Sequence, residues 1–293
     1  MRGVLNANKP SGISSYDVIR QVKQLVPSPT ALGHAGTLDP LASGVLLVLM
    51  GEATKVSRFL LSLPKEYVAG VMFGKQTDTD DITGRTLSVG PVAGVEAETV
   101  RNALERFLGE IEQIPPVFSA IKQDGRPLYR LARAGQEVHP RPRKVTVHQL
   151  ELLDWRPPTA VIRCRVSAGT YVRALARDLG TSLGTVATLA SLVRTKVGRF
   201  TVEDSTSPAA LDSASLSNRL VPIDAALNGM PRVTVSPAQA LHLLQGRALV
   251  VDAFPSSLGV DGFALAATED CRFLAVVVRK GAELRTERII YAD

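Results

Sequence analysis

One carboxylate in a short loop is the residue best placed to do chemistry. The stretch LGHAGTLDPLASGVLLVLM, residues 32–50, holds Asp39 between a leucine and a proline, just before a continuous apolar run. Pro40 keeps the residue before it extended, and His34 lies a short way back in the same stretch. A carboxylate held at the start of a buried strand could act as a nucleophile or a general base. It could equally cap a turn, as Asp often does, and the residues alone favour neither role.

A tyrosine and an arginine stand at a second junction that could take part in the same chemistry. In SAGTYVRALARDLG, residues 167–180, Tyr171 and Arg173 follow Gly169, where a strand is expected to give way to a helix. An arginine is always charged and can hold a carboxylate through two parallel contacts. If Arg173 pairs with Asp39, the carboxylate stays ionised and oriented, as a nucleophile requires. The alternative is an ordinary surface arginine on the first turn of a helix.

An acidic tract, KQTDTDDITG at residues 75–84, raises the question of a metal site. Asp78, Asp80 and Asp81 crowd together, but Ile82 stands where a phosphatase-type motif needs threonine, and no glutamate closes a calcium loop. A turn rich in hydrogen bonds from side chain to backbone is the better interpretation. The sequence also lacks a glycine-rich nucleotide loop with its required partners. We therefore expect neither a metal nor a cofactor.

A basic segment interrupted by glycine and proline lies near the middle of the chain. Its basic residues are Lys122, Arg126, Arg130, Arg133, Arg141, Arg143 and Lys144. Only Asp124 and Glu137 oppose them, and the interruptions are too frequent for a long core helix. The whole chain carries a formal net charge of +6, with a pI near 9.5. A basic insertion at about residues 118–145 is typical of an arm that grips a phosphate backbone, although a solvated loop would have the same composition.

The hydrophobic patterns predict an α+β fold with a mixed, mostly antiparallel central sheet and flanking helices. Strands are expected at residues 65–74, 144–155 and 159–168, of which the last two alternate apolar and polar side chains. Helices are expected at residues 16–26, 94–111 and 171–184. Ser14 and Ser15 supply a good cap for the first of these helices.

A second, smaller unit is expected from residue 232 onward. The small and polar stretch at residues 203–220 indicates connecting structure. Beyond it, the pattern gives one short helix and then several strands separated by turns. We therefore expect a larger domain at residues 1–231 and a small β-rich domain at residues 232–293.

Composition excludes several classes of protein. The 293 residues are 45% hydrophobic, enough for a sizeable core. Apolar runs stay well short of the ~20 residues that span a bilayer, and the N-terminal stretch lacks the pattern of an export signal. Cys164 and Cys271, the only cysteines, show neither pairing nor metal spacing, so we expect two buried thiols in a reducing cytosol. The expectation is a cytoplasmic monomer without a membrane segment.

A series of motifs occurs in one order from Val4 to about Phe200. The motifs are NKPSGISS (8–15), GHAGTLDPLASGVL (33–46), GEATK (51–55), KEY (65–67), PPVFSAIKQDGRPLYRLARAG (115–135), GTYVRALARDLG (169–180) and LVRTKVGRF (192–200). Together they closely resemble the TruB family, the bacterial tRNA pseudouridine-55 synthases. The tail from about Arg232 resembles the family's PUA-type module, a small β-barrel that contacts the acceptor end of tRNA. The resemblance implies the pseudouridine synthase fold followed by a PUA-like domain.

The resemblance also implies roles for the residues of the loop and the junction. Asp39 falls on the family's catalytic aspartate, which attacks the target uridine, and Arg173 would pair with it. Tyr67 would stack on the flipped base and is the candidate for removing the proton from C5. Tyr171 would help to line the pocket, and Leu192 would form an apolar wall beside the uracil.

Other residues would contact the RNA or support the site. His34 would stack within the RNA loop in the space that the flipped base leaves. Lys9 and Pro10 would buttress the site, and Lys55 would be a supporting basic residue. The basic insertion at about residues 118–145 would be the family's thumb-like arm, closing over the T-loop.

The function implied is isomerisation of uridine 55 in the T-loop of tRNA, by base flipping and attack by an aspartate. No atom enters or leaves in this reaction, so it needs no cofactor. The expected partner is tRNA, bound at the T-loop and elbow and through the C-terminal domain at the acceptor end. Two alternatives are a non-catalytic protein that binds or folds tRNA and a hydrolase that releases uracil.

Overall fold

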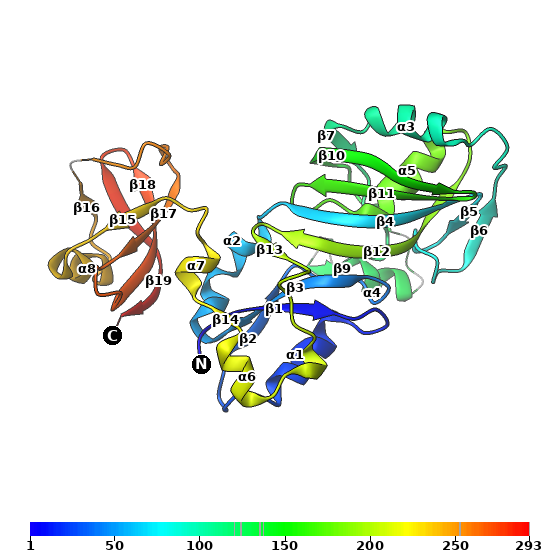
Figure 1. The fold of residues 1–293 in the computed structure, drawn as a ribbon. Coiled ribbons are helices and arrows are strands. Elements are labelled where there is room, and N and C mark those ends of the chain that lie inside the picture. The colour runs from blue at the N-terminus through cyan, green and yellow to red at the C-terminus, as the bar shows by residue number, and fades with distance from the viewer. Residues whose placement is uncertain (120, 124, 135, 137, 252, 293) are drawn as a thin grey trace.

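A large central sheet dominates the computed structural model, which describes residues 1–293 except 120, 124, 135, 137, 252 and 293 (Figure 1). In order across the sheet, the main strands are β14 (Leu220–Val221), β1 (Gly3–Lys9), β3 (Ser43–Met50), β12 (Ala187–Val197), β4 (Lys65–Phe73), β11 (Thr159–Val166), β10 (Arg143–Arg156) and β7 (Gly109–Gln113). Strands β2 (Leu32–Ala35) and β13 (Phe200–Thr201) pair with β3 and β12. Within this sheet only β3 and β12 run parallel among the described pairings, so the predicted mixed, mostly antiparallel sheet is confirmed.

Strand β3 is apolar throughout because both of its faces are covered. Leu46 and Val48 belong to the main core, whereas Leu47 and Leu49 face a second apolar cluster. That second cluster includes the helices η1 (Gly51–Val56) and α2 (Ser57–Leu61), which follow β3 directly. A strand with one face in water would alternate apolar and polar residues, so the unbroken apolar run reflects a central position.

Helices cover one face of the sheet. Over it lie α3 (Ala97–Glu105) and α5 (Val172–Ser182), while α1 (Ser15–Lys23) begins at the predicted cap (Figure 1). The helix predicted over residues 94–111 is too long, because Gly109 has a φ of +88° and the following residues pair with β10. Among the described residues no helix is both long enough and apolar enough to cross a membrane.

The stretch at residues 203–220 is more than the connection that its composition indicated. It contains η2 (Pro208–Ala210) and α6 (Ser213–Asn218), and it ends at the first residue of β14. Leu216 of α6 is fully buried in the main core, and β14 pairs with β1 as an outer strand. The structure therefore corrects this expectation, since single apolar residues in the stretch complete the edge of the sheet.

The C-terminal part of the chain forms a second, curled sheet, joined to the first by α7 (Ile223–Ala226) (Figure 1). Its strands, in order, are β15 (Arg232–Thr234), β17 (Phe263–Ala267), β18 (Phe273–Lys280), β19 (Glu283–Ala292) and β16 (Leu249–Val250). Helix α8 (Pro237–Leu244) lies beside it. The small β-rich unit expected from the sequence is thus present and is PUA-like.

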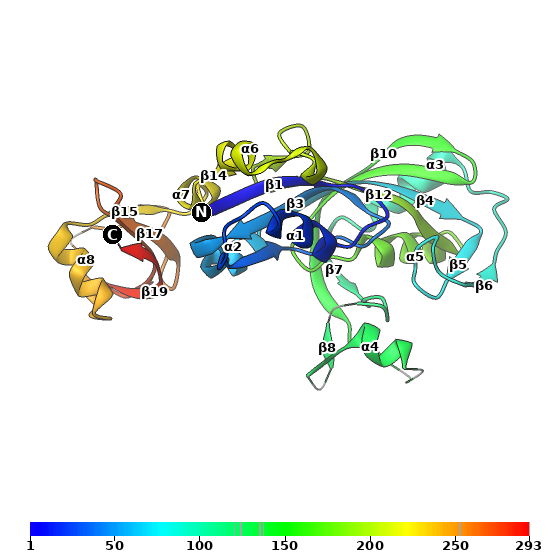
Figure 2. The same cartoon turned by 90° about the horizontal axis from the view of Figure 1, so that it is seen from below.

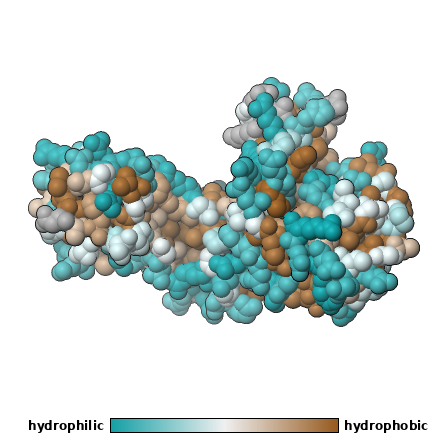
Figure 3. All heavy atoms as spheres, turned by 90° about the horizontal axis from the view of Figure 1, so that it is seen from above, coloured by the Kyte–Doolittle hydropathy of each residue, from teal (hydrophilic) through white to brown (hydrophobic). Residues whose placement is uncertain are grey.

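The two parts of the molecule meet through α2, and a narrow waist between them is visible in Figure 3. The rings of Phe59 and Phe263 lie edge to face, with their centroids 5.2 Å apart. The guanidinium of Arg58 lies over both rings and pairs with Glu287 at 2.6 Å. Because aromatic and cation–π contacts at one place reinforce each other, α2 is a firm point of attachment for the C-terminal sheet.

The basic insertion forms an arm that stands out from the body of the molecule (Figure 2). It holds a short hairpin of β8 (Lys122–Gln123) and β9 (Arg126–Pro127), followed by α4 (Leu128–Arg133). A second small hairpin, β5 (Lys75–Thr77) with β6 (Thr86–Val89), lies at the far end of the central sheet. Leu128 and Val138 of the arm are buried, so the arm makes apolar contacts in addition to carrying charge.

The two cysteines lie in different surroundings. Cys164 on β11 is buried, and burial raises the pKa of its thiol to about 12. Cys271 is exposed in the turn between β17 and β18, so the expectation of two buried thiols is wrong for this residue. Its exposure follows from its place in the turn between two strands, which the composition does not reveal.

Candidate active site

A cavity of about 470 Å³ opens where the Asp39 loop meets the sheet. Its walls come from that loop, from β4 and β12, from the start of α5 and from the root of the arm. The residues that the sequence placed in the pocket and that do line the cavity are Asp39, Tyr67, Tyr171, Arg173 and Leu192. They come from four separate segments, and only the folded sheet brings them together.

The Asp39 loop is supported by a buried lysine and a buried serine. Lys9 at the end of β1 is fully buried, and its Nζ donates to three backbone carbonyls, including that of Pro40 at 3.4 Å. The hydroxyl of Ser15 donates to the carbonyl of Leu38 at 3.0 Å and accepts from its N–H at 2.9 Å. The side chains of Ser15 and Lys9 therefore hold the backbone groups of Leu38 and Pro40, the two residues next to Asp39. This support fixes the direction of the carboxylate.

A buried arginine lies where the Asp39 loop joins the sheet. Arg194 on β12 lies opposite Gly44 of β3 and is 1% exposed. Its guanidinium donates to the carbonyl of Val45 at 2.7 Å and to that of Gly36 at 2.9 Å. A Cβ atom on Gly44 would lie 2.3 Å from the carbonyl oxygen of Arg194, so only glycine allows the two strands to come this close.

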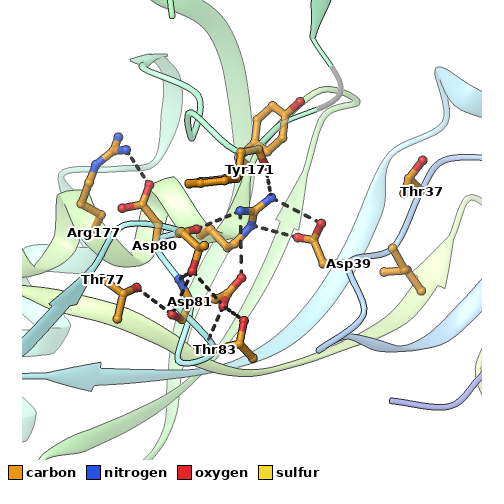
Figure 4. Close-up of polar contacts among 12 residues, drawn as sticks. Thr37, Asp39, Thr77, Asp80, Asp81, Thr83, Tyr171 and Arg177 are labelled. Atoms are coloured by element: carbon orange, nitrogen blue, oxygen red, sulfur yellow. Dashed lines mark hydrogen bonds and ion pairs between the residues drawn. The ribbon is translucent and has the colours of Figure 1, made fainter. Parts of the chain in front are cut away.

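The carboxylate and the arginine of the two junctions form an ion pair. Oδ2 of Asp39 lies 2.8 Å from Nε of Arg173, and Nη2 of the arginine donates to Oδ1 at 3.3 Å (Figure 4). The same guanidinium donates to the carbonyls of Thr79 at 2.8 Å and Phe118 at 3.0 Å. The arginine side chain is 6% exposed and that of Asp39 is 38% exposed. The buried guanidinium of Arg173 is thus held rigidly and orients the carboxylate of Asp39, which still faces the cavity.

The acidic tract forms a turn behind this arginine (Figure 4). Oδ1 of Asp81 accepts from the N–H of Thr83 and from the hydroxyl of Thr79, both at 3.0 Å, which is the predicted kind of turn. Oδ2 of Asp81 lies 4.0 Å from Nη1 of Arg173. The described residues include no group of His, Cys, Asp or Glu placed to hold a metal ion. The tract supports the arginine instead, a function that the sequence did not reveal.

Aromatic and aliphatic side chains complete the walls. Tyr67 on β4 and Leu192 on β12 are each 8% exposed, and both line the cavity. Burial raises the pKa of Tyr67, although the neighbouring Arg194 opposes this shift. Burial also raises the pKa of Tyr171, the residue that caps α5. Both phenols are therefore protonated near neutral pH.

Comparison with known proteins identifies the family. Residues 23–172 match the family model described as TruB family pseudouridylate synthase (N terminal domain). The chain is 42% identical, over 99% of its length and 95% of the relative's, to a Ralstonia nicotianae protein named tRNA pseudouridine synthase B. The chain belongs to the TruB family. A Burkholderia mallei protein of the same name is 46% identical, over 84% of this chain and 82% of the relative.

Solved structures show the same fold as this TruB chain. A Cbf5–Nop10–Gar1 complex contains a chain that matches with a TM-score of 0.76 and 24% identity, covering 99% of this chain and 85% of that one. An H/ACA RNP bound to a substrate RNA containing 2′-deoxyuridine gives 0.73 and 23%, covering 98% and 84%. The fold is therefore that of a pseudouridine synthase with a PUA-like C-terminal domain, as the resemblance implied.

Three residues expected in the TruB site lie outside the lining of the cavity. His34 is on β2 and half-buried, and burial lowers the pKa of its imidazole. Lys9 lies beneath the Asp39 loop rather than in the cavity. Lys55 pairs with Glu52, and its Nζ donates to the carbonyl of Ile290 at 3.0 Å, in the C-terminal sheet.

Five basic residues of the TruB arm and its base, among those whose side chains the structure describes, face solvent. The exposed ones are Arg126, Arg130, Arg141, Arg143 and Lys144. Lys144 is paired with Glu110 at 2.8 Å, and Arg143 begins β10. The side chains of Lys122 and Arg133 lie outside what the structure describes. Whether these groups bind phosphate is not decided by their exposure, so their role stays a prediction.

Three residues of the site were not predicted from the sequence, namely Lys65, Asp81 and Arg194. A signal existed for Lys65, two residues before Tyr67 on β4, and for Arg194, two residues after Leu192 on β12, because residues two apart on one strand share a face. Lys65 is 6% exposed and donates from Nζ to the carbonyl of Leu61. Burial, with help from the charge of Arg194, lowers its pKa from 10.5 to about 8.

We expect Lys65 to make stability depend on pH. Between the lowered pKa of about 8 and the ordinary 10.5, the unfolded chain binds more protons than the folded chain. The free energy of unfolding therefore rises with pH through this window, and the gain is lost as pH falls through 8. Urea unfolding measures the free energy of unfolding of wild type and of Lys65→Met. The wild-type value should rise relative to that of the variant from about pH 7.5 to about pH 9.5, by up to about 1.4 kcal/mol per pH unit.

The control for this measurement is Lys196→Met, which removes an exposed lysine from β12. It should leave the pH dependence of unfolding unchanged, because this amine is in contact with water in both the folded and the unfolded chain. A change of equal size in both variants would show that another group causes the effect.

Proposed function

We propose that this chain converts uridine 55 in the T-loop of tRNA to pseudouridine, with Asp39 starting the reaction. The observation that carries the proposal is the ion pair of Asp39 with Arg173 at 2.8 Å, in a cavity of about 470 Å³ beside Tyr67. That volume is in the range of cavities that take a small ligand, such as a single nucleoside. The relatives at 40–46% identity are named tRNA pseudouridine synthase B, which supports tRNA as the substrate.

The target base has to leave its stack to reach the cavity. Turning a nucleotide outward costs ~a few kcal/mol, and stacking on an aromatic ring such as Tyr67 returns ~1–3 kcal/mol. His34, on β2 just before the Asp39 loop, would occupy the space that the base leaves. Binding of the RNA and flipping of the base are then coupled, because the loop that presents Asp39 comes directly after His34 in the chain.

In the proposed reaction the Asp39 carboxylate acts in a pocket that the bound base fills, so that water is kept out. The N–C glycosidic bond breaks, the uracil turns, and a C–C bond forms at C5, whose proton leaves while N1 takes one up. Arg173 keeps the carboxylate oriented through these steps, and Tyr67 with Leu192 shields the detached base so that it recombines. A conventional glycosidase uses two opposed carboxylates, whereas the nearby Asp81 is engaged by Thr83 behind the arginine.

In the proposed reaction Tyr67 contributes an aromatic ring for stacking, and its phenol is not already ionised to act as a general base. Because burial raises the pKa of the phenol, it enters the reaction protonated. Stacking against uracil needs no ionisation, so this role fits the resting state of the side chain. Removal of the C5 proton by Tyr67 would require the phenolate, which the nearby guanidinium of Arg194 favours only against the effect of burial.

Contacts to the rest of the RNA would come from the arm and from the C-terminal domain. The arm at about residues 118–145 would close over the T-loop, and the domain at residues 232–293 would reach the acceptor end. Residues 1–231 would form the catalytic domain, from which the arm projects. Phosphate contacts give affinity without sequence information, so selectivity would rest on the shape of the folded loop.

The arm gives a test of its own. Reversing charge in the double variant Arg141→Glu and Arg143→Glu should weaken tRNA binding and flatten its dependence on salt. For each phosphate that the variant no longer binds, the slope of log affinity against log salt should fall by about 0.7 to 0.9. Fluorescence titration of tRNA at several salt concentrations measures this slope. Reversal of the exposed Arg156, on the far end of β10, is the matched control, and equal slopes in all three proteins would remove the arm from the interface.

One assay separates the proposed function from its alternatives. Purified protein is incubated with an unmodified tRNA transcript, and pseudouridine at position 55, free uracil and bound RNA are measured separately. The proposal expects pseudouridine at that position and no free uracil. Binding without either product would indicate a protein that binds or folds tRNA, and free uracil would indicate a hydrolase. A transcript with cytidine at position 55 should remain unmodified.

A further inference from the structure

The arm meets α5, the helix that carries Arg173 and is called the catalytic helix below, at a buried glutamine. Gln113 is the last residue of β7, where the chain leaves the sheet toward the arm, and it is 1% exposed. Its Nε2 donates to the carbonyl of Tyr171 at 3.1 Å, and its Oε1 accepts from the N–H of the same residue at 2.8 Å. Tyr171 caps α5, so one side chain holds both backbone groups of the residue that begins the catalytic helix.

Two further contacts join the same pair of segments. Nη2 of Arg177 donates to the carbonyl of Ile114 at 2.8 Å, and Nη2 of Arg173 donates to that of Phe118 at 3.0 Å. The root of the arm, residues 113–118, is therefore bonded to three places along the first two turns of α5. The last of these contacts uses the guanidinium that also holds Asp39.

We propose that Gln113 is a positioning residue for catalysis. It lies away from the cavity lining, so it acts through Tyr171 rather than on the substrate. By fixing the root of the arm against the first turn of α5, it sets the direction in which Arg173 presents Asp39. This inference rests on the proposed function, because it concerns the rate of that reaction.

The chemistry of the side chain makes the proposal specific. A glutamate in place of Gln113 has the same shape and keeps the acceptor, but an ionised carboxylate would face the carbonyl oxygen of Tyr171 across 3.1 Å. That contact is repulsive, and the carbonyl loses its donor. When the glutamate is protonated it again offers one donor and one acceptor, as glutamine does. Burial raises the pKa of such a carboxyl, which brings its titration within reach of the assay.

The test is single-turnover pseudouridine formation by Gln113→Glu on a T-arm stem-loop, at a temperature well below unfolding. We expect a rate about 10- to 100-fold below wild type near pH 8, because small misplacements of reacting groups have effects of this size. RNA affinity should stay within about threefold. The ratio of variant to wild-type rate should recover as pH is lowered toward about 5.5, where the glutamic acid form restores the missing donor.

A matched control and a second variant complete the design. Gln149→Glu introduces the same change at an exposed position of β10, and its rate ratio should stay near one at every pH. Should Gln113→Glu not fold, Gln113→Asn keeps both amide groups but is too short to span both Tyr171 groups, and it should show the same loss of rate.

Three outcomes would overturn the proposal. A rate equal to that of wild type near pH 8 for both Gln113→Glu and Gln113→Asn would show that Gln113 does not position the site. So would a loss of rate that is the same at all pH values, or weaker binding with an unchanged rate. An inactive wild type would instead overturn the proposed function, so the two failures are distinguishable.

Discussion

Replacing Asp39 by asparagine is expected to abolish pseudouridine formation while leaving the protein folded and able to bind tRNA. The amide has nearly the same shape but carries no negative charge, so it cannot serve as the nucleophile. We expect single-turnover rates to fall by at least about 1,000-fold, as they do when an enzyme loses its reacting group. Arg173 keeps its bonds to the carbonyls of Thr79 and Phe118, so the cavity should persist.

Binding and catalysis have to be measured side by side for this variant. tRNA affinity within about threefold of wild type, together with a lost rate, would assign Asp39 to the chemical step. Asp154→Asn, which removes a half-exposed carboxylate near the end of β10, is the matched control and should be fully active. Normal turnover by Asp39→Asn would refute the assignment of this residue as the nucleophile.

Replacing Arg173 by lysine should have the second largest effect. Lysine keeps the charge but cannot contact Asp39 with two nitrogen atoms while also donating to Thr79 and Phe118. The carboxylate would lose its fixed direction and a buried carbonyl would lose its donor. We expect the rate to fall by about 100-fold, comparable to the loss of one preorganised donor in an active site.

The control for this variant is Arg163→Lys, an arginine of β11 that pairs with Glu151 at 2.6 Å on the solvent side of the sheet. Exposed ion pairs contribute little, so its rate and stability should match wild type. A circular dichroism melt of each variant separates loss of fold from loss of orientation. If Arg173→Lys turns over at the wild-type rate, the ion pair does not prepare Asp39 for the reaction.

Local patterns were sufficient to locate the main elements of the site. Alternation of apolar and polar residues marked β10 and β11, and the fully apolar run of β3 indicated a strand covered on both faces. The position of Asp39 next to that run, between leucine and proline, indicated a fixed carboxylate. Its role as a catalytic aspartate came from the family resemblance, since the residues alone allowed a turn cap equally well.

Local patterns failed where a distant partner decides the structure. Residues 109–113 continue the apolar spacing of α3, yet they form a strand because β10 offers hydrogen bonds to their backbone. Arg194 stands in a strand where a charged residue is normally exposed. Arg194 lies two residues from Leu192 in unbroken register against β4, so both side chains line the cavity. The fold alone places the carbonyls of Gly36 and Val45 where the buried guanidinium can donate to them.

The sequence by itself determined the family, the type of fold and five of the residues that line the cavity. Short motifs were sufficient to identify them, because each motif is a run of neighbouring residues that can be recognised in the sequence alone. Only the tertiary structure decided how those residues are supported, since Lys9, Asp81 and Gln113 act on groups that lie far away along the chain. A buried polar atom must find a partner wherever the fold places one, and only the folded chain shows which partner that is.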